Sequence, residues 1–119
     1  MIVNFSNQTH ELTDVEVYLL DFVKELFVQH DEVNPVKGYR ICERVNVHCD
    51  REGINYRLSE PRLRKMVNYF RSNSVIPLLA TSQGYYVTTD KTLIQLQIES
   101  LCQRAGSIAN CASGLQNFL

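Results

Sequence analysis

The 119-residue sequence predicts a mainly α-helical domain with one β-hairpin, an α+β fold. Apolar residues recur at helical spacing over residues 13–29 and 59–72, and with a period of two over residues 75–88. From residue 94 to the end they recur alternately four and three residues apart, the spacing of a long helix with an apolar seam. The 45% hydrophobic and 21% charged content supports a folded domain rather than a disordered chain.

The first helix is expected to begin at Thr13 or Asp14 and to run to about Gln29. Either residue can cap the helix, and Glu16 in the first turn favours the helix dipole. One apolar face is predicted, formed by Val15, Leu19, Phe22 and Leu26. Residues 1–12 show no periodicity, so we expect an arm or a strand there.

A shorter second helix is expected over residues 36–47, with Ile41, Val45 and His48 on one side. His48 fits a structural histidine better than a metal ligand or a base, because no partner cluster accompanies it. Residues 50–53 are typical of a turn, and residues 54–58 of a short extended segment.

The third helix has the clearest signals. Ser59 is a cap and Pro61 is tolerated in the first turn, where its missing amide proton costs nothing. A buried stripe is expected, formed by Leu63, Met66, Val67 and Phe70. The opposite face holds Arg62, Lys65, Asn68, Tyr69 and Ser72, with Arg64 and Arg71 on its flanks. These side chains are the donors that contact phosphates and base edges in nucleic acids.

Two β-rich runs follow, over residues 75–80 and 85–88, and the four residues between them predict a hairpin loop with Gly84 at its end. Pro77 is expected on an edge strand or outside the ladder. The hairpin tip, which includes Ser82 and Gln83, carries no lysine or arginine.

The last helix is expected to start at Asp90 or Thr92. Its seam is typical of a coiled coil and predicts a homodimer; the alternative is packing against the chain's own first helix. Gly106 and Gly114 each cost helix stability, so the distal part is expected to bend or break. The seam, our predicted dimerisation surface, consists of Ile94, Ile98, Leu101, Ala105, Ile108, Ala112 and Leu115.

Charge is unevenly distributed along a chain whose net charge is only −1. Residues 1–36 contain seven acidic residues and one lysine, whereas residues 51–71 contain six bases and two acids. The basic block is a candidate polyanion site. Alternatively, it is a solvated helix face whose charge the acidic first helix balances.

Other classes of function have little support. The four cysteines show no C-x-x-C spacing, which disfavours a metal site, and we expect them to be reduced thiols. The three histidines lie in different elements and no phosphate-binding glycine loop occurs, so we expect no enzyme, no cofactor and no small-molecule substrate. No apolar run is long enough for a membrane span and no signal peptide is apparent, so we expect a cytoplasmic protein.

The order of predicted elements, together with residues 63–71, 75–79 and 84–87, resembles the winged helix-turn-helix proteins of phages and bacterial mobile elements. The trailing helix, with residues 93–101, Arg104 and Ile108, continues the resemblance, which covers residues 36–110. One departure is the connection at residues 48–58, which is longer than the usual turn of three or four residues. The resemblance implies a winged-helix domain over residues 13–90 and an additional helix over residues 91–119.

The resemblance also implies sequence-specific binding of double-stranded DNA in a bacterial or phage-infected cell, as a regulator or a replication accessory protein. The third helix would enter the major groove, and the hairpin tip would contact an adjacent phosphate or the minor groove. The implied DNA-binding residues are Arg62, Arg64, Lys65, Asn68, Tyr69, Arg71, Ser82 and Gln83. Replacing Arg62 and Lys65 by alanine is expected to abolish binding with little change in melting temperature. The alternative function is a protein-interaction adaptor that does not bind DNA.

Overall fold

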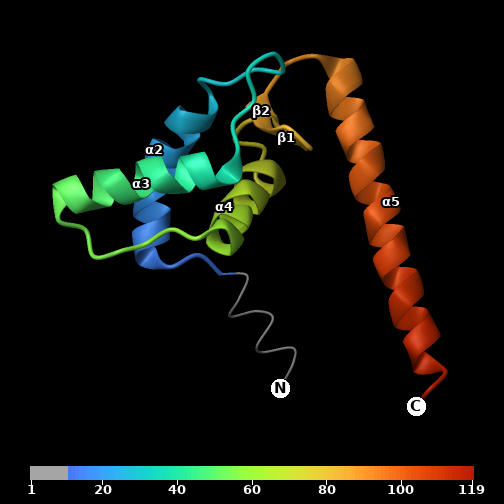
Figure 1. Ribbon diagram of the computed structural model, residues 1–119. Helices are drawn as coiled ribbons and strands as arrows, with labels where there is room; N and C mark the ends of the chain where they lie inside the picture. The colour runs from blue at the N-terminus through green and yellow to red at the C-terminus, as the bar shows by residue number, and fades with distance from the viewer. Residues whose placement is uncertain (1–10) are drawn as a thin grey trace. The chain divides into compact units, whose positions relative to one another are not determined.

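The structure, a computed structural model, describes residues 11–119. It confirms a mainly helical chain with a two-stranded antiparallel hairpin (Figure 1). Residues 1–10 of the arm or strand expected at residues 1–12 lie outside the described part of the chain. The chain divides into two compact units that meet between Thr88 and Thr89. The elements are α2 (Asp14–Phe27), α3 (Gly38–Glu52), α4 (Glu60–Ser72), β1 (Leu78–Thr81), β2 (Gly84–Val87) and α5 (Lys91–Gln116).

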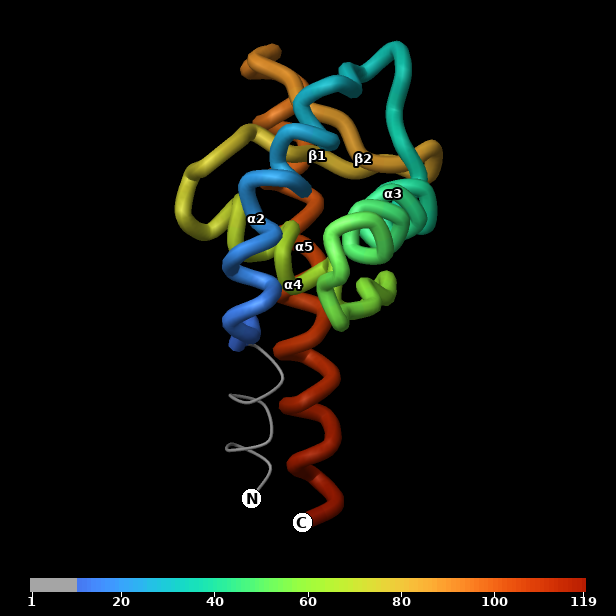
Figure 2. The backbone as a smooth tube through the Cα atoms, turned by 90° about the vertical axis from the view of Figure 1, so that its left-hand side faces the viewer, coloured from blue at the N-terminus to red at the C-terminus, as the bar shows by residue number. Residues whose placement is uncertain are grey.

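The first unit is built around one core between α2, α3 and α4, and the hairpin closes the end where α2 finishes (Figure 2). Phe27 of α2 packs edge-on against Phe70 of α4, with ring centroids 6.3 Å apart. The buried stripe expected on α4 is confirmed. On α2 the buried face is turned from the expected one: Val15 and Phe22 are only partly buried, and the buried residues are Glu16, Leu19, Leu20, Val23, Leu26 and Phe27.

The expected boundaries of the second helix are wrong at both ends. α3 starts at Gly38 and continues to Glu52, through most of the segment that we expected to be a turn. Only Gly53 leaves the helix, with a φ of +68°, the left-handed conformation that commonly ends helices. His48 stacks on Phe22 with ring centroids 4.0 Å apart, a structural contact of the expected kind.

Residues 54–58 have no regular secondary structure, although an extended segment was expected. The segment is held by Asn46 of α3, whose side-chain Oδ1 accepts from the Leu58 amide at 2.8 Å. The Asn46 Nδ2 donates to the Leu58 carbonyl at 3.2 Å. Because Leu58 is buried, these two bonds fix the backbone directly before α4 begins.

The hairpin is tighter than predicted. Its register runs from Leu78 opposite Val87 to Thr81 opposite Gly84, so the turn has two residues rather than four. β2 also pairs with an isolated residue before α3: the amides and carbonyls of Val36 and Tyr85 exchange hydrogen bonds of 2.8 and 2.7 Å. β2 therefore lies between β1 and Val36, and Pro77 stays outside the ladder as expected.

The second unit is a single helix. Asp90 caps α5 by accepting from the amides of Thr92 and Leu93 at 2.9 and 3.3 Å. The helix does not break at the glycines: α5 continues through Gly106 and Gly114. No residue of α5 is buried. Among residues 11–119, no helix has the length and apolar content needed to cross a lipid bilayer.

Candidate nucleic-acid interface

The outward face of α4 carries the side chains that the sequence indicated for nucleic acid. Ser59 caps the helix, its hydroxyl accepting from the Arg62 amide at 3.4 Å. The buried stripe of α4 faces the core, so its other positions must point outward. The exposed side chains include Arg64, Asn68, Tyr69 and Ser72, and Lys65 is half-buried beside them.

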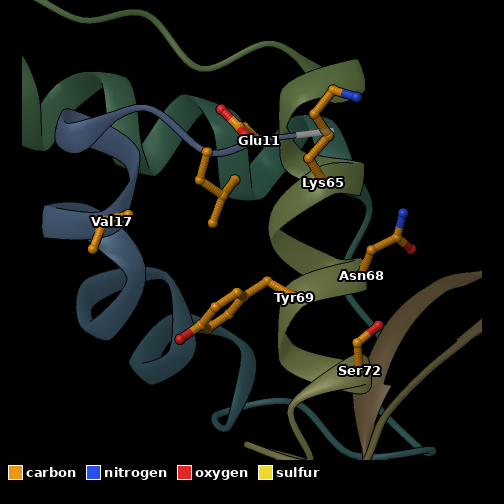
Figure 3. A pocket seen from close by; sticks show the side chains of 7 residues that line it. Glu11, Val17, Lys65, Asn68, Tyr69 and Ser72 are labelled. Atoms are coloured by element: carbon orange, nitrogen blue, oxygen red, sulfur yellow. The ribbon is translucent and has the colours of Figure 1, made fainter. Parts of the chain in front are cut away.

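A groove of about 580 Å³ separates this face from α2 (Figure 3). In Figure 3 the ring of Tyr69 points toward α2, while Lys65, Asn68 and Ser72 follow one another along α4. On the α2 side the groove is lined by Glu11, Leu12 and Val17. The groove is therefore polar and basic along α4, while Val17 of α2 and the preceding residues Glu11 and Leu12 line its opposite side.

Arg62 does not belong to this exposed surface, because its guanidinium is bound by Glu16 of α2. The Arg62 Nε donates to Glu16 Oε2 at 2.7 Å, and Nη2 donates to Oε1 of the same carboxylate at 2.5 Å. A further bond of 3.1 Å runs from Nη2 to the carbonyl of Glu11. The sequence interpretation gave Glu16 only a favourable position in the first turn of the helix. Its side chain is in fact 1% exposed, and that of Arg62 is 27% exposed.

Glu16 collects two further donors. The hydroxyl of Tyr56 donates to Oε2 at 2.6 Å and the amide of Thr13 donates to Oε1 at 2.8 Å. Burial alone would raise the pKa of Glu16, but the hydrogen bonds from Arg62, Tyr56 and Thr13 outweigh it and lower the pKa to about 2. Burial and the bond to Glu16 raise the pKa of Tyr56. The ion pair between Glu16 and Arg62 therefore joins α2 to α4, and the bonds from Tyr56 and Thr13 support it.

Arg71 also has a structural contact. Its Nε donates to the carbonyl of Leu78 at 2.8 Å, which ties the last turn of α4 to the first residue of β1. Of the bases predicted to contact DNA, Arg62 and Arg71 thus bind other parts of the chain. Arg64 and Lys65 remain on the outer surface.

Sequence reasoning missed a cation at the hairpin tip. The Nζ of Lys37, the residue before α3, donates to the carbonyl of Ser82 at 2.8 Å. Ser82 and Gln83 themselves are exposed. Because 45 residues separate the two partners, no local pattern indicates this contact. The sequence offered one indirect signal. Val36, a β-branched residue after Pro35, is typical of a short strand and could have indicated pairing with the hairpin next to Lys37.

Gly84 allows this arrangement. Its φ is +133°, and a Cβ at this position would lie 2.4 Å from the Val36 carbonyl oxygen. A Cβ on Gly38 would lie 3.1 Å from Glu60 Oε1 and 3.4 Å from the Tyr85 ring. The start of α3, the first turn of α4 and β2 therefore meet closely, which brings Lys37 to the same end of α4 as Arg64.

Arginines of α3 form a second basic row that the sequence interpretation did not single out. Arg40, Arg44 and Arg51 are exposed at positions that share one side of the helix. Arg40 makes a 3.7 Å ion pair with Glu43, and both side chains are largely exposed. This row provides a natural comparison for the α4 face.

The predicted dimerisation residues all lie on α5. Ile94 is half-buried and the other six are exposed, including Ile108 at 70% and Leu115 at 68%. Cys102 and Cys111 of α5 are exposed free thiols, whereas Cys42 and Cys49 are buried in the first unit. Within residues 11–119, no three histidine, cysteine or acidic side chains gather as a metal site would require.

Comparison with known protein families, with curated protein sequences and with solved structures finds no match to this chain.

Proposed function

We propose that this protein is a winged-helix protein that binds double-stranded DNA sequence-specifically, with α4 in the major groove. The order of α2, Val36, α3, α4 and the hairpin supports this proposal, as does the position of β2 between Val36 and β1. The observation that carries it is the exposed α4 face, on which Arg64 and Lys65 lie beside Asn68. A binding role fits this surface better than catalysis.

Each group on the α4 face has a chemical role in such a complex. Arginine and lysine bind phosphate oxygens or guanine, and asparagine can bind adenine through two hydrogen bonds. Tyr69 and Ser72 can donate to phosphate. At the hairpin, Lys37 adds positive charge beside Ser82, so the tip is less neutral than its own residues indicate.

The second copy is part of the proposal. In a dimer held together by α5, the two α4 faces would contact two half-sites. This raises the affinity for DNA without any new contact within either winged-helix domain. The resemblance to phage and mobile-element winged helix-turn-helix proteins extends the proposal in two ways. The protein would act as a regulator or a replication accessory protein, and it would do so in the cytoplasm of a bacterial or phage-infected cell.

The proposal is tested by titrating a labelled duplex with the protein at several salt concentrations and following fluorescence anisotropy. With Lys37, Arg64 and Lys65 as the cations of the proposed DNA-binding surface, we expect about three phosphate contacts per protomer and a slope of roughly −3 in log K against log salt. A dimer with both heads bound would roughly double that slope. Absence of binding at low salt would contradict the proposal.

One observation favours the adaptor alternative. The groove between α2 and α4 includes Val17, which is 54% exposed, and the neighbouring outer surface of α2 exposes Tyr18 at 73%. Exposed apolar groups of this kind are typical of protein contacts. If duplex DNA does not bind, this groove becomes the candidate surface for a protein partner.

A further inference from the structure

One face of α5 is comparable in area to one side of a standard protein interface, and this inference rests on the homodimer proposed above. The helix has 26 residues and is therefore about 39 Å long. Half the surface of a cylinder of that length and about 11 Å diameter is roughly 700 Å². A standard interface buries about 800 Å² per partner. The helix is also poor in charge, since Lys91, Glu99 and Arg104 are its only charged side chains.

The order of large and small residues along the seam distinguishes the two possible orientations. In a parallel, in-register pair each seam residue faces its own copy. Ala105 would face Ala105 and Ala112 would face Ala112, each between layers of paired leucine or isoleucine. Since interiors pack at uniform density, such layers would leave voids beside the alanines or force the helices to vary their separation.

An antiparallel pair removes this mismatch. If Leu101 faces Ala112 of the second copy, Ala105 faces Ile108 of the second copy and Ile98 faces Leu115 of the second copy. The two-fold axis repeats each contact, so six successive layers are filled. Each of the four central layers then combines one alanine with one large residue, which keeps the helix separation nearly constant.

We propose that α5 pairs with α5 of a second copy in this antiparallel register. Gly106 and Gly114 lie outside the seam, so neither glycine interrupts the proposed contact. The first residues of the two helices would then lie about 45 Å apart, whereas a parallel pair would hold them about 10 Å apart. The antiparallel orientation would therefore attach the two DNA-binding units at opposite ends of the paired helices. For comparison, one turn of duplex DNA is about 34 Å long.

Disulfide trapping in the 119-residue chain tests the register. In a background with Cys102→Ser and Cys111→Ser, we compare Leu101→Cys, Ala112→Cys and the double variant under mild oxidation. A disulfide needs Cα atoms within about 7 Å. In the antiparallel register residue 112 lies about 16 Å along the axis from its own copy, so neither single variant can cross-link. The double variant should become a covalent dimer through two 101–112 bridges.

Other outcomes separate the possible failures. Cross-linking of Ala112→Cys alone would establish a parallel pair and overturn the proposal. A non-covalent dimer that no variant cross-links would overturn the register. If sedimentation shows a monomer, the proposed dimer is contradicted. The anisotropy titration of the parent chain reports independently on DNA binding. The Cys102→Ser, Cys111→Ser background without added cysteines must stay uncross-linked.

Discussion

The guanidinium of Arg62 neutralises a carboxylate that has almost no contact with water. Arg62→Ala would leave Glu16 charged and buried, with only Tyr56 and Thr13 as donors. Removing one member of a buried ion pair costs about 3–5 kcal/mol, so we expect a loss near 3 kcal/mol in the free energy of unfolding. Urea denaturation measures it. Lys65→Ala is the matched control and should change stability by less than about 0.5 kcal/mol.

This expectation replaces the one drawn from the sequence, in which the Arg62 and Lys65 double variant kept its melting temperature. A stability loss equal to that of Lys65→Ala would show that the ion pair between Arg62 and Glu16 contributes nothing. The double variant is accordingly unsuitable for testing DNA binding, because loss of folding and loss of contacts would coincide.

Glu16 also makes stability depend on pH. Its folded-state pKa, about 2, lies below its ordinary value of 4.5. The ionised group therefore stabilises the fold fully above pH 4.5, and this contribution is lost as the pH falls toward 2. Unfolding free energies measured at pH 6 and pH 3 should differ more in the parent than in Glu16→Gln. Equal pH dependence in the two proteins would rule out this role for Glu16.

At the residue scale, the sequence could indicate which residue types α4 exposes but not which of them have partners. The spacing of Leu63 and its companions predicted the buried stripe correctly, but it also placed Arg62 on the outward face. Arg62 and Glu16 are 46 residues apart, and Lys37 and Ser82 are 45 apart. Such contacts depend on how elements pack, which periodicity does not contain.

The hairpin depends on one backbone position. Gly84→Ala would place a methyl group against the Val36 carbonyl oxygen and hold alanine at a φ that it rarely adopts. We expect a loss of about 2–3 kcal/mol in unfolding free energy, with separation of β2 from Val36. Gly53→Ala is the control, since its φ is also positive but nothing lies within 4 Å of the new methyl group. It should cost only about 1 kcal/mol. Equal losses would contradict the close approach at Gly84.

Elements with local end signals could be predicted closely. Ser59 and Asp90 mark the starts of α4 and α5 within one residue, because each caps its own helix. α3 was predicted poorly: residues 50–53 have the composition of a turn, yet only Gly53 adopts a non-helical conformation. The strand expected at residues 75–80 starts later than predicted, because only Leu78 and later residues pair with β2.

If α5 joins two copies of the chain as proposed, charges introduced into its seam should separate them. Leu101→Asp with Ile108→Asp would put two carboxylates into the seam, and we expect the full chain to become monomeric. Leu96→Asp is the control: it is 56% exposed and lies outside the seam, so the dimer should persist. Sedimentation velocity distinguishes the species. Dimers in both variants would contradict a role for the seam.

An anisotropy comparison of two double variants decides whether the α4 face binds duplex DNA as proposed. Arg64→Ala with Lys65→Ala removes two positive charges from this face, and Arg40→Ala with Arg44→Ala removes two from α3. Both variants have the same net charge. At moderate salt we expect the α4 variant to bind at least tenfold more weakly than the parent, and the α3 variant to stay within about threefold. Equal weakening by both, or none from the α4 variant, would contradict α4 as the DNA-binding helix.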